Sequence, residues 1–133
     1  MEFVFLAVLL LVPVVYLVVT VARVQAGALA AAEGAREAGR AYVTAADEQS
    51  GVRRASAALA LAYRDQGFGP PGPDQLRISC AGTECRQAGA RVTVRAELTV
   101  PLPGVPRFLT RLIPASVTMR STHVATVDEF ARG

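Results

Sequence analysis

The first part of the chain is apolar over about the thickness of a membrane. From Phe3 to Ala22 the only polar side chains in the sequence are Tyr16 and Thr20. As a helix, this stretch reaches roughly 30 Å, which is the hydrocarbon thickness of a bilayer. The pattern therefore predicts a transmembrane segment over residues 1–23.

The residues that follow, 24–46, are rich in Ala and contain no proline. Ala, Arg, Glu and Gln favour helix, although the glycines in this stretch weaken it. Two glutamates each stand three residues before an arginine, which is the spacing for pairing on a helix surface. We therefore predict one long helix from about Phe3 to about Ala45, leaving the membrane without a break.

Pro13 lies near the middle of the apolar run. A proline leaves the carbonyl four residues earlier, here on Leu9, without its usual partner and so bends a helix. Inside a membrane, neighbouring helices or local adjustments compensate for this loss. We predict a helix that continues through Pro13 with a bend.

Small residues recur every four positions along the predicted helix. Such a stripe lies on one face and allows another helix to approach closely. Frequent use of Ala and Gly in a GC-rich coding sequence is the alternative explanation. The stripe consists of Gly27, Ala31, Ala35 and Gly39.

A second helix is predicted over residues 47–67. Asp47 is the expected N-terminal cap, with Ser50 as the alternative. Gly67 suits a left-handed C-terminal cap. The Gly- and Pro-rich residues 68–75 cannot form a regular element and are predicted to be a linker.

The last part of the chain, residues 76–133, has the pattern of a small antiparallel sheet of about three strands. Apolar and polar residues alternate from Val92 to Val100, which is typical of a strand with one buried face. In a later strand, Val117, Met119 and Ala125 share a face with His123. The predicted class is α+β.

A short amphipathic helix is predicted between the last two strands. Its apolar residues stand at i, i+3, i+4 and so on, with arginines between them. Its apolar face either covers the sheet or lies on a membrane surface or a partner. The surface consists of Phe108, Leu109, Leu112 and Ile113, preceded by Val105.

The two cysteines, Cys80 and Cys85, stand close together in the sequence CAGTEC. The glycine between them suggests a tight turn, which would bring the two sulfurs within bonding reach. A disulfide here would imply an extracytoplasmic domain. Two unpaired thiols are the alternative, and a metal site would need more ligands than these cysteines and the distant His123.

Charge and motifs argue against nucleic-acid binding and catalysis. The net charge is +3 and all 14 basic residues are Arg, but they are scattered, and Arg53-Arg54 is the one adjacent pair. A basic patch interleaved with aromatics is therefore missing. The sequence also lacks the common nucleophile, nucleotide and zinc motifs. We expect no enzyme activity, no catalytic or metal site, no cofactor and no nucleic-acid partner.

The order of these features resembles the TadE/TadG-like family, in its actinobacterial form. The residues that carry the resemblance are MEFVFLAVLLLVPVVY, GAREAGRAYV, the Cys-x4-Cys strand pair and a closing strand ending HVATVDEF. Members of this family are small pilin-like (pseudopilin) proteins of the Tad, or Flp, pilus machinery. The resemblance covers nearly the whole chain.

The resemblance implies assembly through apolar N-terminal helices, with other pilin-like subunits and the Tad assembly platform as partners. The hallmark of the family is an acidic residue near the start of the apolar helix, and Glu2 matches it in context. A carboxylate in an apolar environment is costly unless paired. A neighbouring subunit's N-terminal ammonium could supply that pairing, so Glu2 and Pro13 are the candidate assembly residues.

Two aspects of topology follow from the resemblance. The family's usual leader is basic, whereas only Met1 precedes Glu2 here, so the sequence does not itself predict processing by a prepilin peptidase. The positive-inside rule, applied to Arg23, would place the C-terminal part in the cytoplasm. The cysteine pair and the family favour the opposite, an extracytoplasmic domain on a single-pass anchor in the cell membrane, with incorporation into a surface pilus as one fate.

Two other functions fit the same pattern. One is a single-pass anchored domain with a binding role unrelated to pili. The other is a secreted protein whose opening is a signal peptide, cleaved near Ala26-Gly27-Ala28. The apolar run is longer than a typical signal and lacks a charged start, which favours the anchor.

Overall fold

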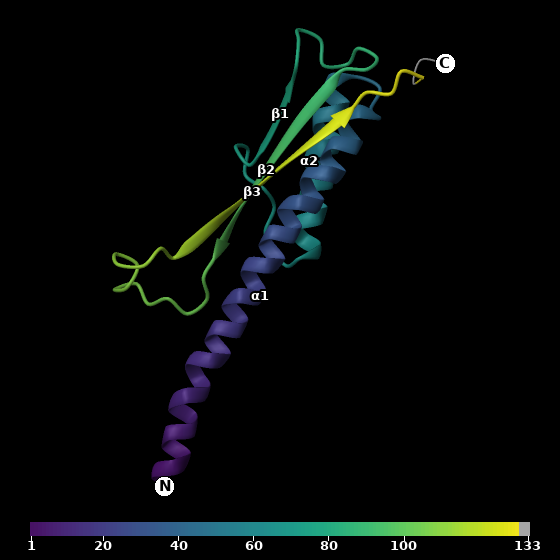
Figure 1. Cartoon of the computed structure of the whole chain (residues 1–133). Coiled ribbons are helices and arrows are strands. Elements are labelled where there is room, and N and C mark those ends of the chain that lie inside the picture. Colours follow the sequence, from purple (N-terminus) through teal and green to yellow (C-terminus); the bar gives the residue numbers. More distant parts are fainter. Residues whose placement is uncertain (131–133) are drawn as a thin grey trace.

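The structure, a computed structural model, describes residues 1–130. It is an α+β fold with a long N-terminal helix, a second helix and an antiparallel sheet packed on the first helix, as predicted (Figure 1). The last three residues of the predicted 76–133 region lie outside the described residues. The elements are α1 (Glu2–Val43), α2 (Glu48–Asp65), β1 (Leu76–Cys80), β2 (Arg91–Pro101) and β3 (Ser116–Thr126).

The helix α1 is 42 residues long and runs continuously through Pro13. Its N-terminal half projects beyond α2 and the three strands, with only the connection between β2 and β3 beside it, while its C-terminal half packs against α2, β2 and β3 (Figure 1). The prediction of one helix that carries on past the apolar run is therefore confirmed. The same helix is both the stem of the molecule and the centre of its core.

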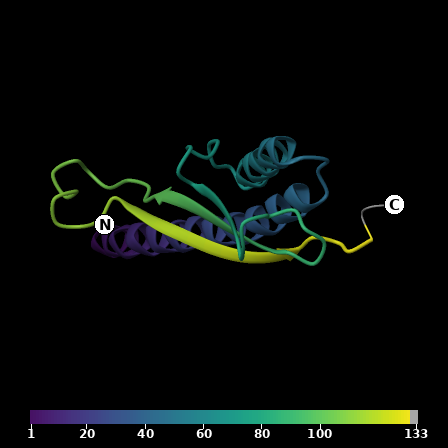
Figure 2. The same ribbon diagram turned by 90° about the horizontal axis from the view of Figure 1, so that it is seen from above.

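The three strands lie in the order β1-β2-β3, and both pairings are antiparallel. Val94 of the central strand pairs with Ile78 on one side and His123 on the other. The predicted alternation along β2 is confirmed, because every second residue from Val92 to Val100 is buried. Figure 2 shows the strands following α1 lengthwise, so this buried face lies on the helix.

Both ends of α2 have the predicted caps. Asp47 accepts a hydrogen bond from the backbone N–H of Ser50 at 2.8 Å, and the Ser50 hydroxyl accepts one in return from the Asp47 N–H. At the other end Gly67 is left-handed, with φ at 79°. The N–H of Phe68 donates to the carbonyl of Tyr63, which satisfies a carbonyl of the last turn.

Two glycines of α1 allow elements to approach the helix from different sides. A Cβ on Gly27 would overlap Cγ2 of Val100 in β2. A Cβ on Gly34 would overlap Cδ1 of Leu59 in α2. Both neighbours are fully buried, so the absence of side chains here lets the sheet and α2 close on the helix.

The prediction of an amphipathic helix between the last two strands is wrong. The connection, residues 102–115, forms a series of turns that we call the β2–β3 loop. Pro106 and Pro114 leave too few residues between them for a stable helix, and an isolated helix this short is unstable in water. Phe108 and Leu112 are 75% and 81% exposed and Ile113 is also exposed, so these side chains do not cover the sheet, whereas Leu109 is half-buried.

Candidate membrane and assembly surface

The N-terminal half of α1 is a bare apolar surface. It is a helix long and apolar enough to span a membrane, and no residue of its most apolar window is buried by the rest of the chain. From Phe3 to Val19 every large apolar side chain is exposed. A soluble protein would bury such a surface, so these side chains require lipid or other apolar helices around them.

Arg23 marks the end of this surface. It is the first charged residue after Glu2, and its guanidinium carbon lies 4.9 Å from the centre of the Phe68 ring. This cation–π contact joins the end of the apolar run to the segment that follows α2. The soluble domain therefore begins directly at the boundary of the apolar run.

Glu2 lies in the first turn of α1, where an acidic side chain interacts favourably with the helix dipole. Its surroundings are apolar and include Phe5 and Leu6. The ion pairs within residues 1–130 join Glu37 to Arg40 and Glu97 to Arg120, so neither involves Glu2. Its carboxylate is available to a partner from outside the described part of the chain.

The predicted small-residue stripe lies in the core of the chain itself. All four members are buried. Gly27 faces Val100 and Met119, and Gly39 faces His123. The close neighbours at these glycines are strands and not the helix that the four-residue spacing suggested. A stripe of small residues allows either a helix or a strand to pack closely, and here the strands of the sheet pack against it.

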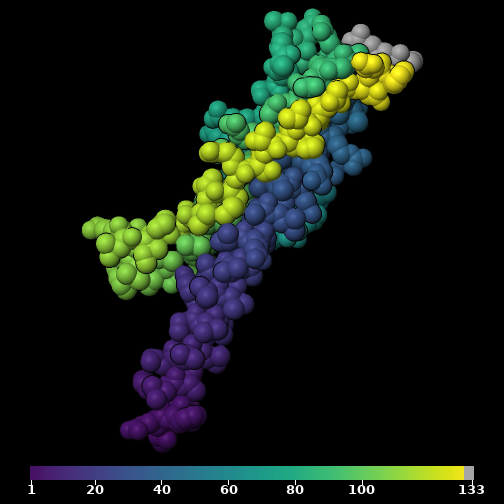
Figure 3. All heavy atoms as spheres, viewed as in Figure 1, coloured from purple at the N-terminus to yellow at the C-terminus, as the bar shows by residue number. Residues whose placement is uncertain are grey.

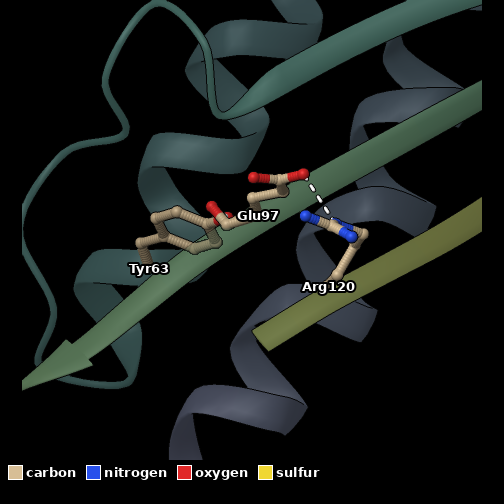
Figure 4. A network of polar contacts seen from close by, with 3 residues as sticks. All are labelled: Tyr63, Glu97 and Arg120. Carbon is tan, nitrogen blue, oxygen red and sulfur yellow. Dashed lines mark hydrogen bonds and ion pairs between the residues drawn. The ribbon is translucent and has the colours of Figure 1, made fainter. Parts of the chain in front are cut away.

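A polar network on β2 joins α2 to the sheet (Figure 4). The Tyr63 hydroxyl donates a hydrogen bond to the backbone carbonyl of Glu97, and Arg120 pairs with the Glu97 carboxylate at 2.7 Å. Burial raises the pKa of Tyr63 to about 12, and the negative charge of Glu97 adds to this rise. The fold therefore favours the neutral phenol.

We expect the free energy of unfolding to fall as the pH rises from about 10 to about 12. The ordinary tyrosine pKa is 10.0, so in this range the unfolded chain loses the Tyr63 proton while the folded chain still holds it. Two pH units correspond to a loss on the order of 2 kcal/mol. Chemical denaturation in detergent micelles, followed by circular dichroism across this range, measures it.

The matched control is Tyr63→Phe. This variant loses the hydrogen bond to Glu97, which costs about 1 kcal/mol at neutral pH. It should show a smaller alkaline loss than the parent chain, although Tyr42, whose pKa burial also raises, still contributes. Equal alkaline losses in the two proteins would contradict the role given to Tyr63.

Cys80 and Cys85 form a disulfide, with their Cα atoms 5.2 Å apart. The bond holds the loop that follows β1, and Arg86 in this loop donates hydrogen bonds to the carbonyls of Tyr42 and Ala45. Its guanidinium thereby caps the C-terminal end of α1, where unpaired carbonyls carry partial negative charge.

Sequence reasoning missed this role of Arg86. A signal was present, because residues 43–46 offer neither the glycine nor the asparagine that usually ends a helix. Beyond the backbone N–H groups of Thr44 and Ala45, donors to this end of α1 had to come from elsewhere in the chain. The disulfide loop supplies it from a segment more than 40 residues away.

Within residues 1–130 there is no cluster of three or more His, Cys, Asp or Glu side chains that could hold a metal ion. Comparison of the chain with protein-family models, with curated proteins and with solved structures gives no match. The likeness to TadE/TadG-like proteins therefore rests on the residues quoted above. The architecture, a long apolar N-terminal helix with a small α/β domain, is compatible with a pilin-like protein.

Proposed function

We propose that the chain is a membrane-anchored, pilin-like (pseudopilin) subunit of a Tad/Flp-type pilus, related to the TadE/TadG-like family. It acts by assembly and not by catalysis. Its partners are other pilin-like subunits and the assembly platform, which it meets through the apolar helix. Its soluble domain lies outside the cytoplasm, in keeping with the disulfide between Cys80 and Cys85.

The observation that carries this proposal is the division of α1 into two halves. The first half exposes its apolar side chains around the whole helix, and the second half is built into the domain core. Cleavage near Ala26-Gly27-Ala28 would cut this helix where Gly27 packs against Val100, which argues against a cleavable signal. A subunit that packs by its apolar stem needs this continuity, because the stem then positions the domain in the assembly.

Glu2 is the proposed determinant of register. In an array of apolar helices its carboxylate would lie in a low-dielectric environment, where an unpaired charge costs several kcal/mol. Pairing with the N-terminal ammonium of a neighbouring subunit removes that cost at one axial position. The position of Glu2 at the end of α1 and its exposure support this role.

The test is the variant Glu2→Ala, expressed in the native organism in place of the parent chain. We expect normal insertion into the membrane, because alanine is apolar, and a reduction of surface pili by at least about tenfold. This estimate follows from the loss of one charge-assisted pair, worth about 1.5–3 kcal/mol. Membrane fractionation and quantification of sheared pili measure the two effects.

Glu33→Ala is the control, because Glu33 lies on the same helix beyond the apolar run and is exposed. It should leave both insertion and pili unchanged. Normal pili from Glu2→Ala would remove the assembly role and favour an anchored domain with another binding function. Failure of insertion would instead show that Glu2 acts in membrane integration.

A further inference from the structure

Within the described residues, the β2–β3 loop is the part of the domain that reaches back along the apolar half of α1 (Figure 1). It projects sideways beside that part of the helix (Figures 1 and 3). Within the loop, Gly104 lies against the ring of Tyr16, since a Cβ on Gly104 would be 3.5 Å from Tyr16 Cε2. The loop is therefore level with residues that we assign to the membrane span.

The depth of this contact follows from helix geometry. Tyr16 precedes Arg23 by seven residues, which is about 10 Å along the helix axis. Glu2 and Arg23 are about 31 Å apart on the same scale, which matches the hydrocarbon thickness. With Arg23 at the edge of the hydrocarbon, Gly104 lies level with the first part of the acyl chains, and the rest of the loop extends sideways from there beneath the headgroups (Figure 1).

The side chains of the loop suit this location. Phe108, Leu112 and Ile113 are exposed, in contrast to the apolar residues of the sheet. Arg107 and Arg111 alternate with them and are also exposed. The sequence has no acidic residue between Glu97 and Asp128, so no side chain of the loop itself repels an anionic headgroup.

We propose that the β2–β3 loop is a second membrane contact, which inserts Phe108, Leu112 and Ile113 into the leaflet beside α1 and places Arg107 and Arg111 on lipid phosphates. The arginines attract anionic lipid, and the apolar side chains leave water. The proposal depends on the membrane span of the proposed function. A second contact would fix the tilt of the domain on the bilayer.

The chain contains no tryptophan, so one introduced tryptophan reports its own surroundings. We would reconstitute full-length Phe108→Trp at high lipid excess into phosphatidylcholine–phosphatidylglycerol vesicles, with and without bromine on the acyl chains. The expected result is blue-shifted emission that loses most of its intensity in brominated vesicles. Phe108 is exposed, so an aromatic replacement should not disturb the fold.

Two control variants separate this proposal from the proposed function. Leu11→Trp lies inside the span and should be quenched whenever α1 crosses the bilayer. In the second variant, Val124→Trp, the replaced residue is exposed on β3 next to His123. His123 contacts Gly39, and Gly39 lies about 24 Å beyond Arg23 along α1, so this position is far from the span. It should keep the emission of a tryptophan in water.

Quenching of Leu11→Trp without quenching of Phe108→Trp would overturn the loop proposal and leave the span intact. Blue-shifted emission of Phe108→Trp that bromine does not quench would also overturn it, in favour of a protein surface as the occupant. Adding Arg107→Glu and Arg111→Glu to Phe108→Trp should reduce the quenching. Unchanged quenching would overturn the role of the arginines.

Discussion

Leu59→Ala is expected to lower the free energy of unfolding by about 3 kcal/mol, the typical cost of removing a fully buried leucine. Leu59 is fully buried in α2, and its Cδ1 occupies the space that Gly34 leaves open on α1. The truncation leaves a cavity between the two helices, because no side chain on Gly34 can fill the space. Chemical denaturation of the full chain in detergent micelles measures this change.

Leu61→Ala is the matched control. Leu61 lies two residues further along the same helix and is 53% exposed, so the same chemical change removes little buried surface. We expect its effect to stay within about 0.5 kcal/mol. Equal losses from the two variants would mean that α2 does not pack on α1 through Leu59.

A pair of charges in the apolar half of α1, Leu10→Arg with Val14→Arg, is expected to prevent stable membrane integration. Each arginine near the centre of a span costs about 2.5–3.5 kcal/mol, so the pair costs about 5–7 kcal/mol. These two residues lie one helical turn apart and are exposed, so the introduced charges would point away from the rest of the chain. Resistance of the protein to alkaline carbonate extraction should be lost.

The corresponding control places two arginines on the soluble domain, as Leu29→Arg with Leu61→Arg. These leucines are 49% and 53% exposed, and the control raises the net charge by the same amount. The control protein should remain in the carbonate-resistant membrane fraction. Full resistance of the Leu10→Arg, Val14→Arg protein would contradict the assignment of this segment as a span.

Local patterns predicted the parts of this fold that depend on local physics. The alternation along β2 was sufficient because a strand with one buried face has a period of two residues. The caps at Asp47 and Gly67 were predicted because the backbone groups at helix ends require particular residue types. The disulfide followed from two cysteines separated by a short turn.

The errors concern contacts between distant segments. The four-residue spacing predicted a helix as the neighbour of Gly27 and Gly39, whereas strands of the sheet pack against both glycines. Helical spacing in the β2–β3 loop also failed, because a short amphipathic segment becomes helical only when its apolar face has a surface to pack on. The capping role of Arg86 depends on a tertiary contact with the end of α1, which no local pattern contains.

Because α1 is continuous across Arg23, no loop separates the apolar half of the helix from the domain. Twisting the apolar half about its axis turns the domain by the same angle, and a force on the domain acts directly on the stem. One extra residue between Val21 and Arg23 would rotate the domain by about 100° and raise it by about 1.5 Å. In the proposed assembly, the face of the apolar half that contacts a neighbouring subunit therefore decides which side of the sheet is turned toward that subunit.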